Sequence, residues 1–237
     1  MGRQVSTTEV SALHDFCVKH FVTHYDVRLE LVDHLATSIE AIWEQNPNLE
    51  FEHALKQVYA GYGKTGFRQL MREKEHAVEK AANKGILTAL KALFSWPQIG
   101  LVITMLLVCY FFYGYYERGN ALAPGIFIYV FSCIALILDL SINVKLYRWR
   151  KQLTQPLLTV QTYAGFYATY IINYVIISTL LKPLFSEQNE SIFTANPLVF
   201  VWCALCCIGC ILLSIAHYRY AKSMFQKARE HYPMAFK

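Results

Sequence analysis

The stretch LAPGIFIYVFSCIALILDLSINV, residues 122–144, decides the fold, because Asp139 is its only charged side chain. A helix of about 20 residues crosses the hydrocarbon core of a bilayer, which is about 30 Å thick. Three other stretches are similarly long and apolar and contain no charged residue: 97–116, 160–181 and 197–217. The sequence therefore predicts four membrane-spanning helices.

Charged residues are unevenly distributed along the 237-residue chain. They make up 16% of the sequence, against about 25% in a typical soluble domain. The first 96 residues hold 11 basic and 12 acidic side chains, whereas the remaining 141 hold 11 basic and only 5 acidic. We predict an all-α protein with a soluble helical domain in residues 1–92, a four-span domain in residues 93–220 and a basic tail in residues 221–237.

The positions of Lys and Arg predict which side of the membrane each connection faces, because cytoplasmic loops carry an excess of these residues. Four basic residues follow the second span and four follow the fourth: Lys145, Arg148, Arg150, Lys151, Arg219, Lys222, Lys227 and Arg229. The other two connections have no such excess. We therefore expect both termini on the cytoplasmic side, and we attribute the net positive charge to topology rather than to nucleic-acid binding.

Apolar residues in the first 92 positions recur every three or four residues, which is typical of amphipathic helices. Ser6 and Glu9 have the spacing of a capping box at the start of the first helix. The second helix is expected from about Asp26 to Gln45 and the third from Phe51 to Tyr59. The fourth is expected to begin near Thr65 and to continue as one helix to Tyr116, with Pro97 as the point where it would bend or restart.

One run in the soluble part carries a family resemblance. Residues 30–35 read ELVDHL, an acidic helix end follows, and then come FEHAL at residues 51–55 and a glycine-rich turn at residues 61–66. This order resembles the HAAS-type helical domain of bacterial membrane proteins, over about residues 10–75. The glycine that usually precedes the third helix of that family is replaced here by the turn at Pro47.

The resemblance implies a function as well as a fold. Members of that family typically join such a cytoplasmic domain to a few transmembrane helices, and many are encoded beside PadR-type repressors. A bacterial inner-membrane protein with a PadR-type regulator as partner is therefore implied. We expect a non-enzymatic regulatory module in which the membrane helices signal along the continuous fourth helix to an acidic face. Glu30, Asp33 and Glu40 form that face and are predicted to bind the partner.

The membrane part supports a second hypothesis, a small transporter or transporter subunit. A carboxylate inside a span is costly and usually faces the bundle interior or a water-filled cavity, so Asp139 could line a polar path. Its position 6 residues before Lys145 equally fits an acid near the cytoplasmic interface. Polar residues that recur at helical spacing on the third span could line the same path: Tyr163, Tyr167, Tyr170, Tyr174 and Asn173. Aromatic packing is the competing interpretation of these tyrosines.

The residue pattern predicts no catalytic, cofactor or metal site. Glu30 and His34 are one pair of possible ligands on the second helix, whereas a structural zinc site needs about four ligands. Four cysteines share one face of the fourth span and are interpreted as small residues at a helix interface: Cys203, Cys206, Cys207 and Cys210. Expected partners are the lipid bilayer, a cytoplasmic protein and a second copy of the chain, without direct nucleic-acid binding.

Overall fold

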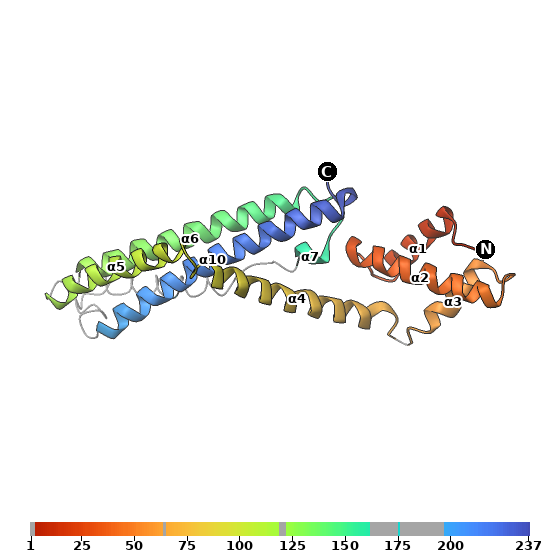
Figure 1. Ribbon diagram of the computed structural model, residues 1–237, viewed down its shortest axis with the longest axis horizontal. Coiled ribbons are helices and arrows are strands. Elements are labelled where there is room, and N and C mark those ends of the chain that lie inside the picture. The colour runs from red at the N-terminus through yellow and green to blue at the C-terminus, as the bar shows by residue number, and fades with distance from the viewer. Residues whose placement is uncertain (1–2, 64, 119–121, 162–174, 176–196) are drawn as a thin grey trace. The chain divides into compact units, whose positions relative to one another are not determined.

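The computed structural model describes residues 3–63, 65–118, 122–161, 175 and 197–237. Its elements in chain order are α1 (Thr7–Lys19), α2 (Tyr25–Gln45), α3 (Phe51–Ala60), α4 (Phe67–Ala92), α5 (Ile99–Glu117), α6 (Leu122–Arg150), α7 (Leu158–Gln161), α10 (Pro197–His231) and the short 3₁₀ helix η2 (Pro233–Ala235) (Figure 1). No β-strand occurs in the described ranges. The predicted all-α class is confirmed.

The chain divides into two compact units, and each is described by itself. The N-terminal unit comprises the described residues of 1–82, 150–162 and 224–237. The apolar unit comprises the described residues of 83–149 and 163–223. Helices α4 and α10 each begin in one unit and end in the other. The chain therefore passes between the units within regular helices as well as through connections.

Helix α1 begins with the capping box that the sequence predicts. The Glu9 N–H donates to Ser6 Oγ at 3.3 Å, and the Ser6 N–H donates to the Glu9 carboxylate at 2.8 Å. Ser6 and Glu9 thus each provide a hydrogen-bond acceptor for the backbone N–H of the other, which stabilises the first turn of α1. Arg3 also forms an ion pair with Glu9 at 3.1 Å. The local signal was sufficient to predict this end of the helix.

Helix α1 ends with an unusual residue in a common motif. The Val22 N–H donates to the Cys17 carbonyl at 2.9 Å, and the Phe21 N–H donates to the Val18 carbonyl at 3.0 Å. This pair of bonds defines a Schellman motif, whose left-handed residue is usually glycine. Here that residue is Phe21, with φ of 66° and a side chain that is 80% exposed. The backbone is therefore strained at a position where the ring gains little from burial.

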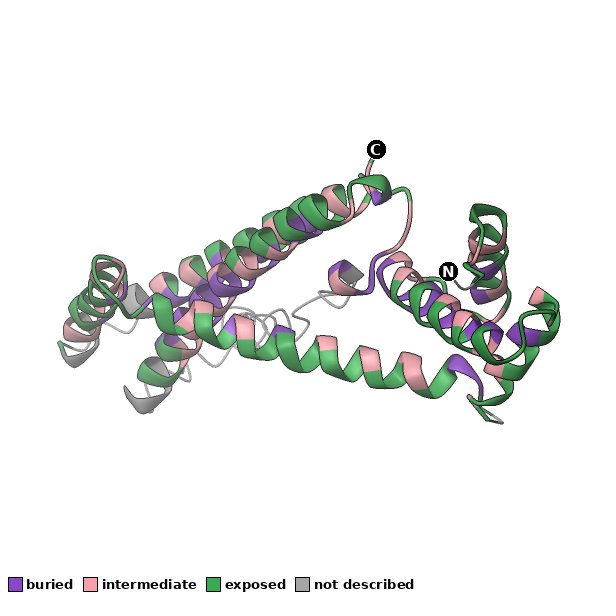
Figure 2. Ribbon diagram, turned by 45° about the vertical axis from the view of Figure 1, so that its right-hand side comes forward, coloured by how far each residue is buried: buried purple, intermediate pink, exposed green. Residues whose placement is uncertain are grey.

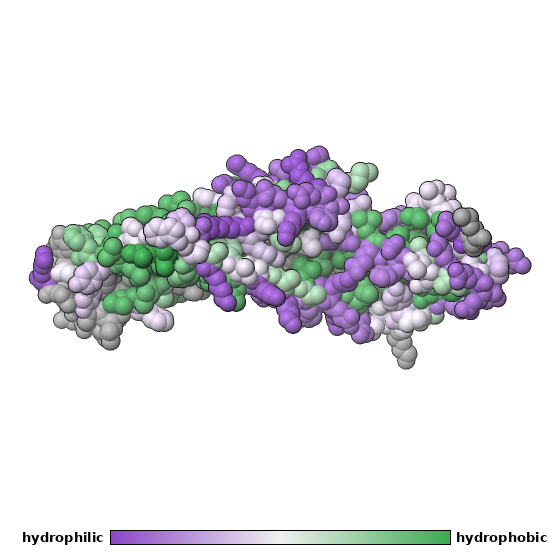
Figure 3. Space-filling model, in the orientation of Figure 1, coloured by the Kyte–Doolittle hydropathy of each residue, from purple (hydrophilic) through white to green (hydrophobic). Residues whose placement is uncertain are grey.

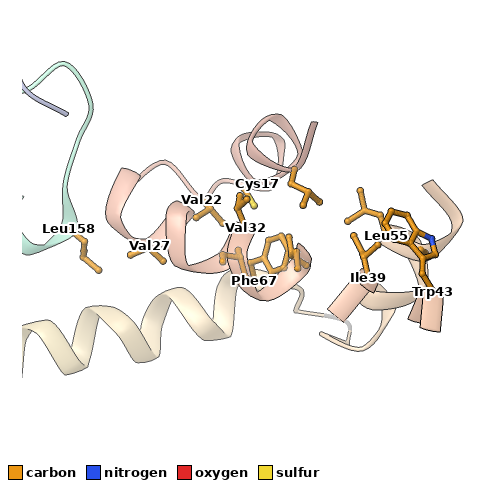
Figure 4. Close-up of a cluster of buried hydrophobic side chains, with 13 residues drawn as sticks. Cys17, Val22, Val27, Val32, Ile39, Trp43, Leu55, Phe67 and Leu158 are labelled. Carbon is orange, nitrogen blue, oxygen red and sulfur yellow. The ribbon is translucent and has the colours of Figure 1, made fainter. Parts of the chain in front are cut away.

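The core of the N-terminal unit is built around α2. One stripe of this helix is buried at helical spacing: Val27, Leu31, Leu35, Ile39 and Trp43. Residues from α1, α3 and the start of α4 pack against it, including Cys17, Leu55 and Phe67 (Figure 4). Leu158 of α7 belongs to the same cluster. A residue that follows α6 in the chain therefore completes the core that the first helices begin.

The expected continuous helix from Thr65 to Tyr116 is wrong. Helix α4 ends at Ala92 and α5 begins at Ile99. Pro97 has no N–H to donate, and its ring disfavours helical geometry at the preceding Trp96. The Leu93 and Phe94 N–H groups bond three residues back, and the Ser95 hydroxyl donates to the Ala92 carbonyl at 2.7 Å. Helix α4 therefore terminates before Pro97.

The core of the apolar unit joins the end of α4 with α5, α6 and α10. It contains Ile86 of α4, Val102 of α5, Ile128 of α6 and Cys207 of α10. Most of α4 is exposed (Figure 2), but its Gly85 meets the Tyr220 ring of α10, where an added Cβ would lie 2.1 Å from Cε2. Glycine thus allows the two helices to approach at this point.

Two helices of the apolar unit are long and apolar enough to cross a membrane. They are α6, over Ile126–Arg150, and α10, over Val201–His231, and α5 is a shorter apolar helix over Ile99–Gly114. Hydrophobic surface gathers over α5 and α6 (Figure 3). Residues 162–174 and 176–196, which contain most of the predicted third span, lie outside the described residues.

We expect Phe21→Gly to raise the free energy of unfolding by about 1 kcal/mol, because glycine adopts the left-handed conformation without a side-chain penalty. Val18→Gly is the matched control. Val18 is also an exposed apolar residue near the end of α1, but its backbone is helical, so glycine should lower stability there by about 1 kcal/mol. Thermal unfolding of the full chain, followed by circular dichroism, ranks the variants. A Phe21→Gly protein that melts below the wild type would contradict the strain argument.

Gly85→Ala should destabilise the apolar unit, because the new methyl group overlaps the Tyr220 ring and must displace it. We expect a loss of about 1–3 kcal/mol. Gly209→Ala in α10 is the control, since nothing lies within 4 Å of its added Cβ and alanine gains about 0.5–1 kcal/mol over glycine within a helix. Unfolding in detergent measures both. Equal effects of the two substitutions would show that Gly85 has no packing role.

Candidate functional site

Two buried aspartates are the candidate functional groups of the described chain. Asp26, in the N-terminal unit, is 7% exposed, and Asp139, in the apolar unit, is 6% exposed. A buried carboxylate is stable as an anion only where hydrogen-bond donors or positive charges replace the water it has lost. The donors around each aspartate therefore determine what it can do.

The Asp26 carboxylate is surrounded by donors. Its Oδ1 accepts the Leu158 N–H at 2.9 Å and the Val27 N–H at 3.1 Å. Its Oδ2 accepts both the backbone N–H and the hydroxyl of Thr159, each at 3.1 Å. Asp26 lies in the first turn of α2, whereas Leu158 and Thr159 begin α7. One carboxylate thus joins the starts of two helices that are far apart in the sequence.

Further hydrogen bonds hold the segment that we call the 152–159 connection. The Tyr25 N–H donates to the Pro156 carbonyl at 2.7 Å, and Arg28 Nη2 donates to Gln155 Oε1. The 152–159 connection therefore contacts the first turn of α2 through backbone and side chains together.

The end of the chain binds the same connection. The Thr154 N–H donates to the Ala235 carbonyl at 2.8 Å, and the Lys237 N–H donates to the Gln152 carbonyl at 2.9 Å. Leu153 and Phe236 form an antiparallel bridge. The segments that follow α6 and α10 are thus fastened to each other within the N-terminal unit. Sequence reasoning missed these contacts, because no periodicity or motif within either segment points to the other.

The three predicted partner-binding acids do not form one free acidic face. Glu30 forms an ion pair with Lys74 at 2.6 Å, and Glu40 accepts the Val5 N–H at 2.9 Å. Asp33 is exposed on α2. Two of the three carboxylates are therefore engaged within the unit. Their role in binding a partner stays a prediction.

The described residues contain no cluster of potential metal ligands. No group of three His, Cys, Asp or Glu side chains in the described ranges is placed to hold a metal ion. Burial raises the pKa of the Cys17 thiol to about 11, so this side chain is a neutral core residue at physiological pH. A neutral buried thiol is a poor nucleophile.

The polar groups of the apolar unit lie along the contact of α6 with α10, which we call the α6–α10 seam and define by Ser132, Asp139, Cys207 and Ser214. Ser132 Oγ lies 3.1 Å from Cys207 Sγ. Ser214 Oγ is hydrogen-bonded to Asp139 Oδ1. The other carboxyl oxygen, Asp139 Oδ2, is buried and has no hydrogen-bond partner among the described residues. The α6–α10 seam therefore contains a buried carboxyl group with a described hydrogen-bond partner at only one of its two oxygens.

The register of the seam gives the relative direction of its helices. Ser132 and Cys207 are 75 residues apart, and so are Asp139 and Ser214. A constant offset means that both helices advance together, so α6 and α10 run parallel. Further along, the Trp149 ring stacks on the Tyr218 ring with centroids 5.9 Å apart. The contact therefore continues toward the ends of both apolar segments.

The other predicted membrane site residues are only partly described. Of the four cysteines, Cys207 and Cys210 are buried, and Cys203 and Cys206 are intermediate. His217 is buried one helical turn beyond Ser214. The tyrosine stripe of the third span lies outside the described residues, namely Tyr163, Tyr167, Tyr170, Tyr174 and Asn173. The structure thus gives Asp139 a partner on α10 but does not test the polar path.

Comparisons with protein-family models, curated proteins and solved structures find no match for this chain. The contacts of Asp26 and Asp139 are therefore the features of the molecule that bear on its function. These contacts have different chemistry, because Asp26 has four donors and Asp139 has one hydroxyl partner.

Proposed function

We propose that the protein is a non-enzymatic integral membrane protein that transmits the state of its membrane helices to a cytoplasmic helical domain, which binds a protein partner. The observation that carries the proposal is the composition of the N-terminal unit. It includes the 152–159 connection and the end of the chain, which follow α6 and α10 directly. Helices α6 and α10 are therefore each followed directly by a segment that packs in the N-terminal unit. A movement of either helix would be passed along the chain to that unit.

The exposed residues of α5 and α6 support membrane insertion. Several large apolar side chains on these helices are more than half exposed, including Leu107, Tyr110, Phe111, Ile126, Ile137 and Leu140. Water would make such surfaces unfavourable, whereas lipid tails cover them without cost. The helices with these side chains are the ones whose length and composition suit a bilayer.

The parallel direction of α6 and α10 supports the four-span arrangement. Over the 22 residues from Pro197 to Tyr218, α10 rises about 31 Å, which is close to the thickness of the hydrocarbon core. Trp149, near the end of α6, stacks on Tyr218, so the end of α6 lies beside α10 at about that distance from the first residue of α10. The predicted third span at residues 160–181 would connect these two levels.

The N-terminal unit also supports the predicted sidedness. Its three chain segments form common contacts, so in a membrane protein they must lie on one side of the bilayer. The basic residues after α6 and along the last part of α10 make that side the cytoplasm. A bacterial inner membrane and a PadR-type regulator as partner belong to this proposal through the HAAS-type resemblance.

The proposed signalling route runs through the 152–159 connection instead of the continuous helix expected from the sequence. Helix α6 leads into this connection, and Asp26 holds the far end of it on α2. A displacement at the end of α6 would therefore act on the first turn of α2. The interrupted segment between α4 and α5 is less suited to transmit such a displacement.

A small transporter is the second candidate function, because Asp139 Oδ2 is buried without a described hydrogen-bond partner. A carboxyl oxygen of this kind could receive a proton or cation in transit. The signalling proposal is preferred because the contacts of Asp26 give the soluble unit a direct part in the response. Transport would leave those contacts without a role beyond stability.

Cysteine labelling tests the four-span arrangement. In a chain without its seven native cysteines, Lys151→Cys and Lys237→Cys should resist a membrane-impermeant reagent added to intact cells, and Asn189→Cys should react. The reason is that the first two positions are on the cytoplasmic side in the proposed topology. Permeabilised cells are the control, in which all three should react. Labelling of Lys151→Cys from outside would overturn the topology.

Asp26→Ala tests the coupling itself. It removes the acceptor of four hydrogen bonds and should destabilise the attachment of the 152–159 connection by about 2–3 kcal/mol. Vesicles made from lipids of two acyl-chain lengths differ in the hydrophobic mismatch between the bilayer and the spanning helices. In the wild type, the rate of amide hydrogen exchange in the first turn of α2 should therefore differ between the two kinds of vesicle. It should no longer differ in Asp26→Ala.

Asp33→Ala is the matched control for this experiment, because Asp33 is an exposed aspartate on the same helix. It should keep the wild-type response to acyl-chain length. Asp26→Asn provides a variant of nearly equal size if the alanine protein does not fold. Exchange in α2 that is insensitive to the bilayer in the wild type, or that responds equally in the Asp26 variants, would refute the proposed function.

A further inference from the structure

Residues 84–98, which we call the α4–α5 junction, expose apolar and basic side chains together. Lys84, Leu87 and Lys91 recur at intervals of three and four residues, so they lie on one face of α4, and all three are exposed. Trp96 follows the helix and is 85% exposed, more than any other large apolar side chain that the structure describes. Lysines mixed with large apolar and aromatic side chains are typical of a helix face at a membrane surface.

Contacts with α10 hold the α4–α5 junction at one level of the apolar unit. Arg219 Nη1 donates to Gln98 Oε1 at 3.1 Å, and the Tyr220 ring packs against Gly85. Arg219 and Tyr220 directly follow the apolar stretch of α10, which ends at His217. The α4–α5 junction therefore lies beside the end of that stretch.

The end of the apolar stretch of α6 lies at the same level. Trp149 of α6 stacks on Tyr218, and Lys145 Nζ lies 5.2 Å from the centroid of the same tyrosine ring. Helix α5 begins at Ile99, the residue after Gln98. Three apolar helices thus begin or end at one level, where aromatic and basic side chains gather as they do at the interface between a bilayer and water.

The exposed charges at this level are all positive. Residues 83–101, 140–149 and 214–223 contain no Asp or Glu, and Asp139, which precedes the second of these ranges, is buried. Six basic side chains in the same ranges are exposed and form no ion pair with a described residue: Lys84, Lys91, Lys145, Arg148, Arg219 and Lys222. Such a surface is complementary to the headgroups of anionic lipids.

We propose that the α4–α5 junction is a binding site for the headgroups of anionic phospholipids in the cytoplasmic leaflet. Trp96 and Leu87 enter the interfacial region, and Lys84 and Lys91 extend from the same surface toward the lipid phosphate groups. A zwitterionic lipid also has a phosphate group but no net negative charge, so the site prefers anionic lipid. This inference rests on the membrane insertion in the proposed function, and it adds a lipid class as a partner.

Quenching of tryptophan fluorescence by brominated lipids tests the proposal in the full chain, which contains four tryptophans. A reporter chain with Trp149→Phe and Trp202→Phe keeps Trp96 and Trp43. Trp43 is fully buried in the core of the N-terminal unit, so brominated lipids should not reach it. Phenylalanine at position 149 keeps an aromatic ring on Tyr218. Any quenching in this reporter chain therefore comes from Trp96.

The reporter chain is reconstituted in vesicles of equal parts phosphatidylcholine, which is zwitterionic, and phosphatidylglycerol, which is anionic, with only one of the two lipids brominated. We expect brominated phosphatidylglycerol to quench Trp96 at least about twice as strongly as brominated phosphatidylcholine, because one basic residue near the surface favours anionic lipid by about fivefold. Lys84→Gln with Lys91→Gln should lower this ratio to about one, since no basic side chain then remains in the α4–α5 junction.

Lys19→Gln with Lys56→Gln is the matched control. It removes the same two charges from exposed positions in the N-terminal unit, and it should keep the ratio of the reporter chain. Equal quenching of Trp96 by the two brominated lipids, or the same loss of preference with either pair of lysine substitutions, would overturn the proposal.

A second reporter chain separates this inference from the proposed function. With Trp96→Phe and Trp149→Phe it keeps Trp202, an exposed residue within the predicted fourth span. Quenching of Trp202 without quenching of Trp96 would refute the lipid site alone. Absence of quenching at both tryptophans would refute the membrane insertion on which the proposed function depends.

Discussion

The carboxylate of Asp26 joins the first helices of the N-terminal unit to a distant part of the chain. Its donors, Leu158 and Thr159, lie 132 and 133 positions further along the chain, beyond two apolar helices. Without this acceptor, two backbone N–H groups at the start of α7 and one hydroxyl group would be left without their partner, and a buried unpaired donor costs about 1–3 kcal/mol. Asp26 thus contributes the largest group of hydrogen bonds to the attachment of the 152–159 connection, beside the Tyr25–Pro156 and Arg28–Gln155 bonds.

The two buried aspartates differ in the donors that surround them. Burial is nearly the same for Asp26 and Asp139, so burial alone does not distinguish them. Backbone N–H groups at the start of a helix are fixed donors, and they suit an anion. Asp139 has only the Ser214 hydroxyl, which also bonds the Cys210 carbonyl of its own helix. The two aspartates are thus equally buried but differ in how many donors contact the carboxyl oxygens.

Local signals were enough to predict the soluble helices but not the contacts between distant segments. The second helix was expected from Asp26 and begins at Tyr25, and the third was expected to end at Tyr59 and ends at Ala60. Caps, turns and apolar spacing act within a few residues, so the sequence reveals them. Proline at 97 was also visible, but its effect on the preceding residue outweighed the periodicity that favoured one continuous helix. The Asp26 contacts and the Ser214 partner of Asp139 depend on tertiary packing, for which neither segment carries a local pattern.

The parallel register of the α6–α10 seam explains why the segments that follow the two helices can meet. Parallel helices end on the same side, so the segments that follow α6 and α10 can meet, and they do so where Gln152 and Thr154 bond the chain end. An antiparallel pair would have separated those segments by the length of the apolar helices.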